Sequence, residues 1–178
     1  MKNVLLSLQR YQDVYSRLPF FQERSRNEFS FRVAILPYIG EKDLAEELKR
    51  QMKENSKLSW RDLIKTEFSE KMPKLFGTKK TVSDLVAVNT NGIAKLSSVR
   101  DGTENTIALI QMPNDRDWTE PFCVTPEEVV NYFDSLEQNS KVLVGFFNGT
   151  VKMLPANIDR DKLRSLCIYN DGKPKRRK

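Results

Sequence analysis

The sequence predicts an α+β fold in which helices come first and an antiparallel sheet follows. Two observations predict it. Through residues 3–73, apolar side chains recur every three or four positions, which is typical of amphipathic helices. After Gly77 the pattern changes to short β-branched and alternating runs, two of which carry Asn-Gly, a dipeptide favoured in tight hairpin turns. Runs of helices followed by runs of strands are typical of the α+β class.

Residues 3–17 are predicted to form an opening amphipathic helix that ends before Pro19, because their apolar residues share one stripe. A further helix is predicted after Gly40, and another begins with Ser59 as N-cap and runs toward Pro73. The side chains expected to pack against the sheet from the opening helix are Leu5, Leu8, Tyr11 and Tyr15. Those expected on the buried side of the helix after Gly40 are Leu44, Leu48 and Met52.

The strands are predicted in the second half of the chain. Residues 81–99 are interpreted as two strands around Asn91-Gly92, and residues 104–113 as a third strand. The clearest signal is a hairpin over residues 141–155 with a two-residue turn at Asn148-Gly149.

Two short helices complete the predicted pattern. The first begins at Thr125 as N-cap, with Pro126 in its first turn and Glu128 three residues after the cap. The second is capped by Asp159 and ends near Leu166. Residues 1–170 are therefore expected to form a single domain, since a chain of 178 residues has the length of one domain and no repeat divides it.

The net charge of +6 is concentrated at the end of the chain. Five of the excess positive charges lie within residues 173–178, so the rest of the chain is almost neutral. We expect residues 171–178 to be a disordered basic tail and expect no nucleic-acid partner, although contact with a nucleic acid or an anionic surface stays open as the alternative. The apolar runs are far shorter than the roughly 18 residues of a membrane span, so none is expected.

No enzymatic mechanism is suggested by the residues. The chain has no histidine, no CxxC pair and no phosphate-binding glycine loop. The first ten residues also lack the apolar core and cleavage site of a secretory signal, so the chain is expected to begin inside a mature domain. We predict a protein that is not an enzyme and needs no cofactor.

The most motif-like segment is residues 101–106. Asp101, Thr103 and Asn105 bring side-chain oxygens to a turn-forming stretch, and Asp101 and Asn105 could ligate a hard cation such as calcium. The spacing of an EF-hand is absent, so a structural turn stabilised by its own backbone contacts is the other interpretation.

A second polar loop, residues 115–121, contains one large aromatic residue, Trp118. The loop is a candidate binding surface on which Trp118 would contact a partner. Alternatively, Trp118 packs the loop against the sheet.

Several segments together resemble a known family. They are VLLSLQRYQDVYSRLP, SFRVAILPYIGEKDL, EKMPKLF, DGTENTIALIQ, DWTEP and GFFNGTVKMLPANIDRDKLRSL, in that order. In this order they resemble domain-of-unknown-function family 1559, a bacterial, planctomycete-type family that is itself similar to type II secretion pseudopilins. The family tends to end with a histidine ahead of an Asp-Gly pair, where this chain has Asn148-Gly149.

The resemblance implies a pilin-like fold, with an N-terminal amphipathic helix and further short helices packed on an antiparallel sheet. It also implies a non-enzymatic structural or interaction role in the cell envelope, with protein partners or self-assembly and with export from the cell. The alternative function is a binding module that uses loops 101–106 and 115–121 for a cation, a glycan or a protein.

Overall fold

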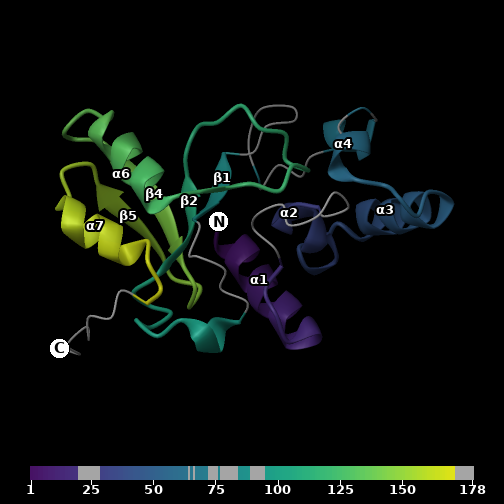
Figure 1. Ribbon diagram of the computed structural model, residues 1–178, viewed down its shortest axis with the longest axis horizontal. Helices are drawn as coiled ribbons and strands as arrows, with labels where there is room; N and C mark the ends of the chain where they lie inside the picture. Colours follow the sequence, from purple (N-terminus) through teal and green to yellow (C-terminus); the bar gives the residue numbers. More distant parts are fainter. Residues whose placement is uncertain are drawn as a thin grey trace.

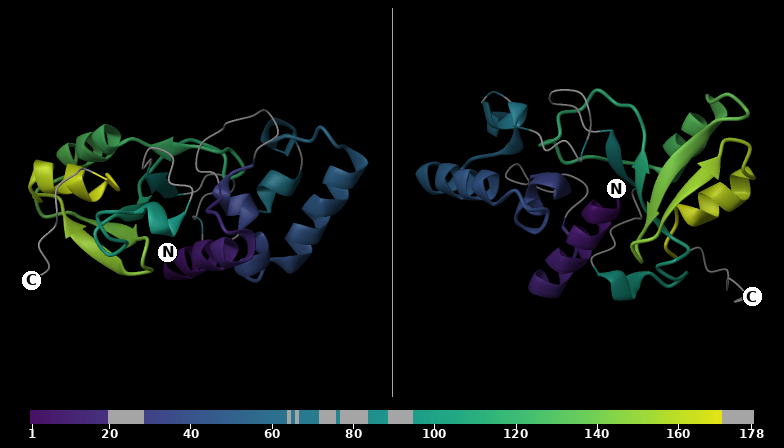
Figure 2. Two further views of the ribbon diagram at one scale, coloured as in Figure 1. Left: turned by 60° about the horizontal axis from the view of Figure 1, so that its bottom comes forward. Right: turned by 180° about the vertical axis from the view of Figure 1, so that it is seen from behind.

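The computed structural model describes residues 1–19, 29–63, 65, 67–71, 76, 84–88 and 95–170, and every structural statement below concerns these residues. The expected basic tail, residues 171–178, lies outside them. The fold is α+β, as predicted, and it consists of a five-stranded sheet with helices on both faces (Figures 1 and 2).

The opening helix is confirmed as α1, Lys2–Tyr15. Its first half packs on the sheet through Val4, Leu5 and Leu8, which are buried. The second half turns away from the sheet, and Tyr15 is exposed, so the expectation that this ring packs against the sheet is wrong. A helix keeps one face on a flat sheet only along the length that the sheet covers, and α1 extends beyond that length (Figure 1).

The helices that follow α1 are short except for one. They are α2 (Phe31–Ala34), the 3₁₀ turn η1 (Leu36–Tyr38), α3 (Lys42–Glu54), α4 (Trp60–Leu63) and α5 (Glu67–Glu70). The single helix expected from Ser59 toward Pro73 is therefore wrong, since α4 and α5 are separate single turns.

The predicted buried side of α3 is correct at Leu44 and Leu48, but Met52 is 45% exposed. The spacing places Met52 on the same stripe, yet α3 extends outward beyond the core that covers its first half (Figure 1).

The sheet has the strand order β3-β1-β2-β4-β5. The strands are β1 (Leu85–Val88), β2 (Ile107–Gln111), β3 (Cys123–Val124), β4 (Lys141–Phe146) and β5 (Val151–Pro155). Because β1 and β3 pair in parallel, the sheet is mixed and the expectation of an antiparallel sheet is corrected. The reason is topological. Because β2 is antiparallel to β1, it finishes at the end of the sheet where β1 starts. A strand that enters the sheet from that same end, as β3 does, runs parallel to β1.

The hairpin predicted over residues 81–99 is also wrong in its pairing. Asn91-Gly92 lies outside the described residues. After it, Leu96–Ser98 forms a 3₁₀ turn, η3, where a strand was expected. The neighbours of β1 are β3 and β2, so both of its edges are occupied by strands from farther along the chain.

The hairpin over residues 141–155 is confirmed as β4 and β5, which pair from Lys141 with Pro155 to Gly145 with Val151. Its turn is longer than the two residues predicted. The Gly149 N–H donates to the Phe146 carbonyl (2.9 Å), and Gly149 has a φ of 86°. This is a turn closed by a left-handed glycine, in which only Gly149 needs a positive φ.

The two predicted C-terminal helices are confirmed as α6 (Pro126–Asp134) and α7 (Arg160–Leu166). Thr125 and Glu128 form the expected capping box, and the Asp159 side chain caps α7. The strand predicted over residues 104–113 is confirmed as β2.

Two apolar clusters lie on opposite faces of the sheet. The strands alternate between them: Leu85 and Ala87 of β1 join α1, α2 and α3, whereas Val86 and Val88 join α6 and α7. Within the described residues, no helix is long and apolar enough to cross a membrane.

Candidate functional site

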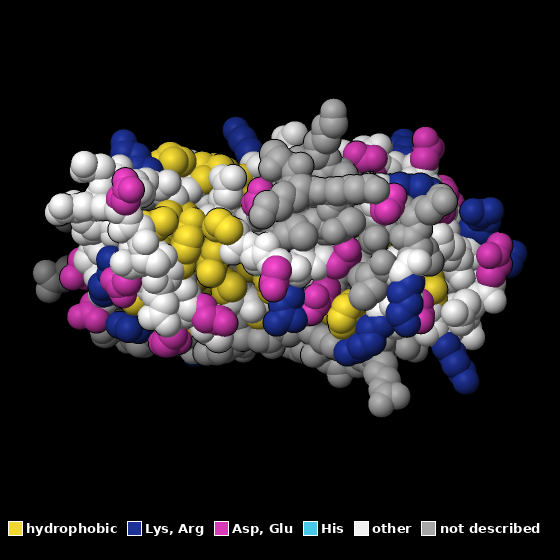
Figure 3. Space-filling view, turned by 90° about the horizontal axis from the view of Figure 1, so that it is seen from above, with side chains coloured by type: hydrophobic (Ala, Val, Ile, Leu, Met, Phe, Trp, Pro, Cys, Tyr) yellow, Lys and Arg dark blue, Asp and Glu magenta, His cyan; other side chains and the backbone are white. Residues whose placement is uncertain are grey.

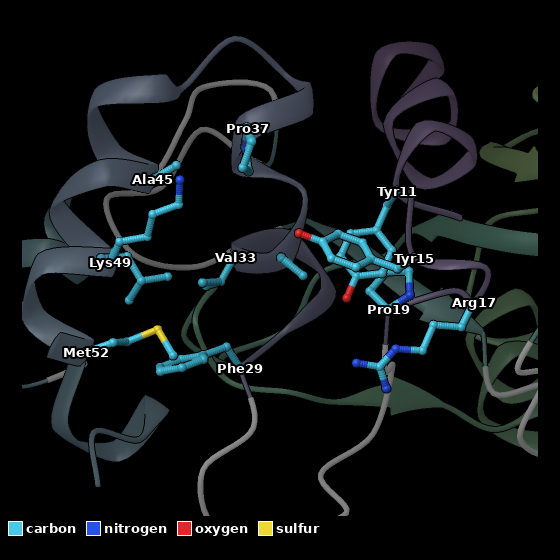
Figure 4. Close-up of a pocket in the computed structure, with 12 residues that line it drawn as sticks. Tyr11, Tyr15, Arg17, Pro19, Phe29, Val33, Pro37, Ala45, Lys49 and Met52 are labelled. Carbon is cyan, nitrogen blue, oxygen red and sulfur yellow. The ribbon is translucent and has the colours of Figure 1, made fainter. Parts of the chain in front are cut away.

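A groove between α1 and α3 combines apolar and charged side chains (Figure 4). Its volume is about 380 Å³. We call it the α1–α3 groove. Its lining residues come from the end of α1, from α2 and η1, and from α3: Tyr11, Tyr15, Arg17, Pro19, Phe29, Val33, Ala34, Pro37, Ala45, Leu48, Lys49 and Met52.

Aromatic rings of α1 form one wall of this groove. The Tyr11 and Tyr15 ring centroids lie 4.4 Å apart, and the Tyr38 ring meets Tyr11 edge-on at 6.1 Å. Both lining tyrosines extend from α1 toward α3 in Figure 4. Because residues four apart on a helix lie above one another, Tyr11 and Tyr15 present adjacent rings to the same space.

The phenols of this wall are in a partly desolvated setting. Burial raises the pKa of Tyr11, and the nearby Arg17 guanidinium lowers it by a smaller amount. Burial also raises the pKa of Tyr38, as does a hydrogen bond with the Tyr15 side chain. The wall is therefore held together by hydroxyl contacts as well as by ring packing.

Arg17 is placed beside the groove by an unusual backbone conformation. Ser16 ends α1 with φ 55° and ψ 21°, and its N–H donates to the Gln12 carbonyl (2.7 Å). Among the described residues Ser16 is the only non-glycine with a positive φ, a conformation that costs about 1 kcal/mol or more for an L-residue. The chain thereby reverses, and Arg17 lies next to the Tyr11 phenol.

The opposite wall comes from α3. Ala45 and Leu48 are buried at its base, and Met52 reaches from its rim toward Phe29 (Figure 4). Lys49 is exposed and bridges to Glu46 (2.7 Å).

Because of the tyrosine wall, the free energy of unfolding should depend on pH in the alkaline range. In the unfolded chain phenols ionise near pH 10, whereas Tyr11 and Tyr38 have raised pKa values when folded. The unfolded state loses these protons first, so the contribution of the two phenols to the free energy of unfolding should fall as the pH rises above about 10.

Urea unfolding of a Tyr11→Phe, Tyr38→Phe double variant checks this, because the substitutions keep the rings and remove only the two hydroxyl groups. With each protein referred to its own value at neutral pH, the free energy of unfolding of the variant should become higher than that of the wild type as the pH rises from about 9 to about 11. Arg32, a buried residue of α2 whose pKa burial lowers to about 9, titrates in the same way in both proteins, so its contribution to the difference cancels. Parallel curves for the two proteins would contradict the prediction.

The predicted residues Asp101, Thr103 and Asn105 do lie together, in a turn with many backbone contacts. The Asn105 amide nitrogen Nδ2 donates to the Asp101 carbonyl (3.0 Å), and the Thr103 carbonyl accepts the N–H of Asn148 (3.1 Å). The turn thus holds the tip of the β4–β5 hairpin. The carbonyls of Asp101, Gly102 and Thr103 already accept hydrogen bonds. The described residues contain no group of three or more acids, histidines or cysteines placed to hold a metal ion.

Trp118 lies in the core and not on a binding surface. Its side chain is fully buried, and its ring stacks with Phe68 (5.6 Å between centroids) and Phe76 (6.0 Å). The Ser30 hydroxyl donates to the Trp118 carbonyl (2.6 Å), which fixes the loop to the start of α2. Contact between the Trp118 ring and a partner is therefore excluded in the folded chain, and packing is its role.

A buried arginine, Arg32, was not anticipated from the sequence. It is fully buried on α2, and its guanidinium donates through Nε and Nη2 to the carbonyl of Leu85 on β1. The guanidinium lies over the rings of Phe31 (4.7 Å) and Phe122 (5.1 Å). Burial lowers the pKa of Arg32 to about 9, against the attraction of Asp117 and Glu120.

The remaining polar atom of this guanidinium, Nη1, is buried and has no hydrogen-bond partner. Burial raises the pKa of the nearby Asp117, whose Oδ1 accepts the N–H (2.8 Å) and the hydroxyl (2.6 Å) of Thr119. Because Arg32 is fully buried, its guanidinium joins α2 to β1 from within the core. An arginine within the apolar stretch FRVAIL was the signal that could have revealed it.

A second hollow lies on the other half of the molecule, where α6 meets the ends of β2, β4 and β5. Figure 3 looks onto this face and shows hydrophobic side chains gathered over it. Its volume is about 440 Å³, and its apolar lining includes Tyr132, Val142 and Met153. Its charged residues, Asp84 and Lys141, have opposite signs, so the hollow favours neither kind of ion.

Comparison with known proteins adds no relative: no family model matches the chain, and neither a curated protein nor a solved structure matches it. The fold defines an α+β domain with a mixed sheet and helices on both faces.

Proposed function

We propose that this chain is a non-enzymatic, pilin-like interaction domain that assembles with further copies of itself through α1. One observation carries the proposal. Of the five large apolar side chains that are exposed in the described part of the chain, three lie on α1: Leu6 at 39%, Val14 at 62% and Tyr15 at 53%. A helix with apolar side chains on both its inner and outer faces is suited to contact a second protein.

Two of these side chains lie on the exposed side of α1, where Leu6 also borders the β4–β5 turn at Gly149. Leu6, Arg10 and Val14 recur every four residues and lie along one face of α1, whereas the buried face carries Leu5 and Leu8. We call Leu6 and Val14 the outer stripe. Pairing two copies of α1 along the outer stripe would remove these side chains from water.

The packing of α1 on the sheet supports the pilin-like part of the proposal. The helix approaches β4 closely at Gly145, where a Cβ atom would lie 2.7 Å from Cδ1 of Leu5. An opening helix laid on a sheet, with a further face left for neighbours, agrees with what the resemblance to pseudopilins implies. That resemblance also implies a role in the cell envelope, after export.

The non-enzymatic part of the proposal has chemical support. The chain has no histidine to act as a general base at neutral pH. The one described carboxylate with a raised pKa, Asp117, is engaged by Thr119 and lines neither of the two hollows.

Site-specific photo-crosslinking tests the assembly. A photoreactive phenylalanine analogue at Leu6 or at Val14 should give crosslinked dimers of the purified protein, since these positions lie in the proposed contact. The same analogue at Lys162, which is exposed on α7, is the matched control and should give none. A Val14→Asp variant should lower the yield from position 6, because a carboxylate in the contact would lose its water.

Crosslinking of equal yield at all three positions would indicate random collision and overturn the proposal. So would a protein that stays monomeric in sedimentation at high concentration and gives no dimer from position 6 or 14.

A further inference from the structure

We infer that the second hollow, where α6 meets the ends of β2, β4 and β5, binds a short apolar peptide by its two free ends. The ammonium end pairs with Asp84, and the carboxylate end pairs with Lys141. The inference concerns a different surface from the outer stripe and does not depend on self-assembly. The volume of about 440 Å³ lies within the range of about 300–1,000 Å³ that is usual for small-molecule sites.

Half of the lining consists of polar side chains that are open to a ligand. The eight lining residues include Asp84, Gln111, Tyr132 and Lys141. Within the described part of the chain, none of these four side chains forms a hydrogen bond or an ion pair. Polar groups in this position at the border of an apolar hollow gain hydrogen bonds from a ligand that supplies the partners.

The sheet sets the spacing of the two charges. Both β1 and β4 are neighbours of β2 and run antiparallel to it, so they start at the same end of the sheet. Asp84 directly precedes β1, and Lys141 is the first residue of β4. Because neighbouring strands lie about 4.8 Å apart, the two backbones that carry these charges are about 10 Å apart. An extended tripeptide spans about 10 Å as well.

Opposite charges at this spacing favour a ligand that also carries both signs. A simple anion would be attracted by Lys141 but repelled by Asp84, and a simple cation would meet the reverse. A peptide with free ends satisfies both residues at once, and free peptide ends are groups that proteins commonly recognise. Gln111 lies on β2, between the two charged residues, where its side-chain amide can bond to the peptide groups of the ligand.

The rest of the lining suits an apolar side chain in the middle of the peptide. It consists of Pro113, Val142, Leu143 and Met153. The Met153 side chain is 52% exposed, so an apolar group placed on it would remove it from water. Since a thioether makes favourable contacts with aromatic rings, a central phenylalanine suits this lining.

Titration of the tripeptide Gly-Phe-Gly into ¹⁵N-labelled protein, followed by amide chemical shifts, tests the site. We expect the largest shifts for residues 111, 132, 141–143 and 153. The N-acetyl form of the peptide lacks the ammonium, and the C-terminal amide form lacks the carboxylate. Each should bind about threefold more weakly than the free peptide, which is the effect of one partly exposed ion pair.

Two variants assign the ends of the peptide to their residues. Asp84→Asn should weaken the free peptide about threefold but should not weaken the N-acetyl form, which has no ammonium. Lys141→Gln should likewise weaken the free peptide but not the amide form. The matched controls Asp43→Asn on α3 and Lys162→Gln on α7 remove the same charges at exposed positions and should change no affinity. Met153→Ala should weaken all three peptides, because it removes part of the apolar lining.

Equal affinity for the free and the blocked peptides would overturn recognition of the two ends. Binding of none of the peptides, or shifts centred on the α1–α3 groove, would overturn the assignment of a peptide to this hollow.

Discussion

Arg32→Ala should lower the free energy of unfolding by about 3–5 kcal/mol, as expected when a large, fully buried side chain is lost. The substitution leaves a cavity between the rings of Phe31 and Phe122 and removes both donors to the Leu85 carbonyl. Because Arg32 joins α2 to β1, the loss should loosen the attachment of the N-terminal helices to the sheet. Urea denaturation followed by circular dichroism measures the change.

Two matched variants separate the size of Arg32 from its charge. Arg32→Met fills most of the volume without the charge, and Arg32→Lys keeps the charge without the planar fork. Since burial lowers the pKa of Arg32 to about 9, the charge itself is unfavourable here, and Arg32→Met should be less destabilising than Arg32→Lys. The reverse order would mean that attraction to Asp117 and Glu120 outweighs the cost of burial.

Gly145→Val should lower the free energy of unfolding by about 1–3 kcal/mol through overpacking. The new side chain would occupy the space of Leu5 Cδ1 and approach Met1 Sδ, which lies 3.0 Å from the position that a Cβ atom would take. At Gly145, therefore, α1 packs directly against the backbone of β4, and the substitution should push the first turns of α1 away from the sheet. Urea denaturation gives the size of the loss.

A double-mutant cycle tests that contact. Leu5→Ala alone should cost about 2–5 kcal/mol, but in the Gly145→Val protein it should cost less, because it makes room for the valine. Leu8→Ala, also buried on α1, is the control and should be additive with Gly145→Val. Additive effects of Leu5→Ala and Gly145→Val would contradict the proposed contact.

The local elements of the fold could be predicted because their signals lie within a few residues. Thr125, Pro126 and Glu128 define the start of α6, and the β-branched arms around Asn148-Gly149 define the last hairpin. In each case the interacting residues are neighbours in the sequence, so spacing and residue type are sufficient.

The pairing of β1 could not be predicted in the same way. Its partners, Ile110 on β2 and Val124 on β3, lie more than twenty residues away, and nothing at Leu85–Val88 specifies them. The short apolar run before residue 91 favoured a local hairpin, but a four-residue strand buried on both faces has no polar side to set its register.

The candidate site was missed for a related reason. Tyr11 and Tyr15 fit the apolar stripe of α1. Only the tertiary arrangement shows that this stripe extends beyond the sheet and faces α3. The polar neighbours of Trp118 in the sequence favour a surface role, yet Phe68 and Phe76 reach its ring from distant segments. Spacing along one helix or loop contains no information on such partners.

The outer edge of β5, the last strand of the sheet, affects how readily the protein aggregates at high concentration. In β5 the even-numbered residues bond to β4, so the outer edge presents Val151, Met153 and Pro155. Pro155 has no N–H, and its carbonyl is taken by Ile158 (3.1 Å). On this edge, only Val151 and Met153 have backbone groups with which an incoming strand could pair. The exposed, charged Lys152 lies between them. Such an edge resists the edge-to-edge stacking that begins amyloid-like aggregation.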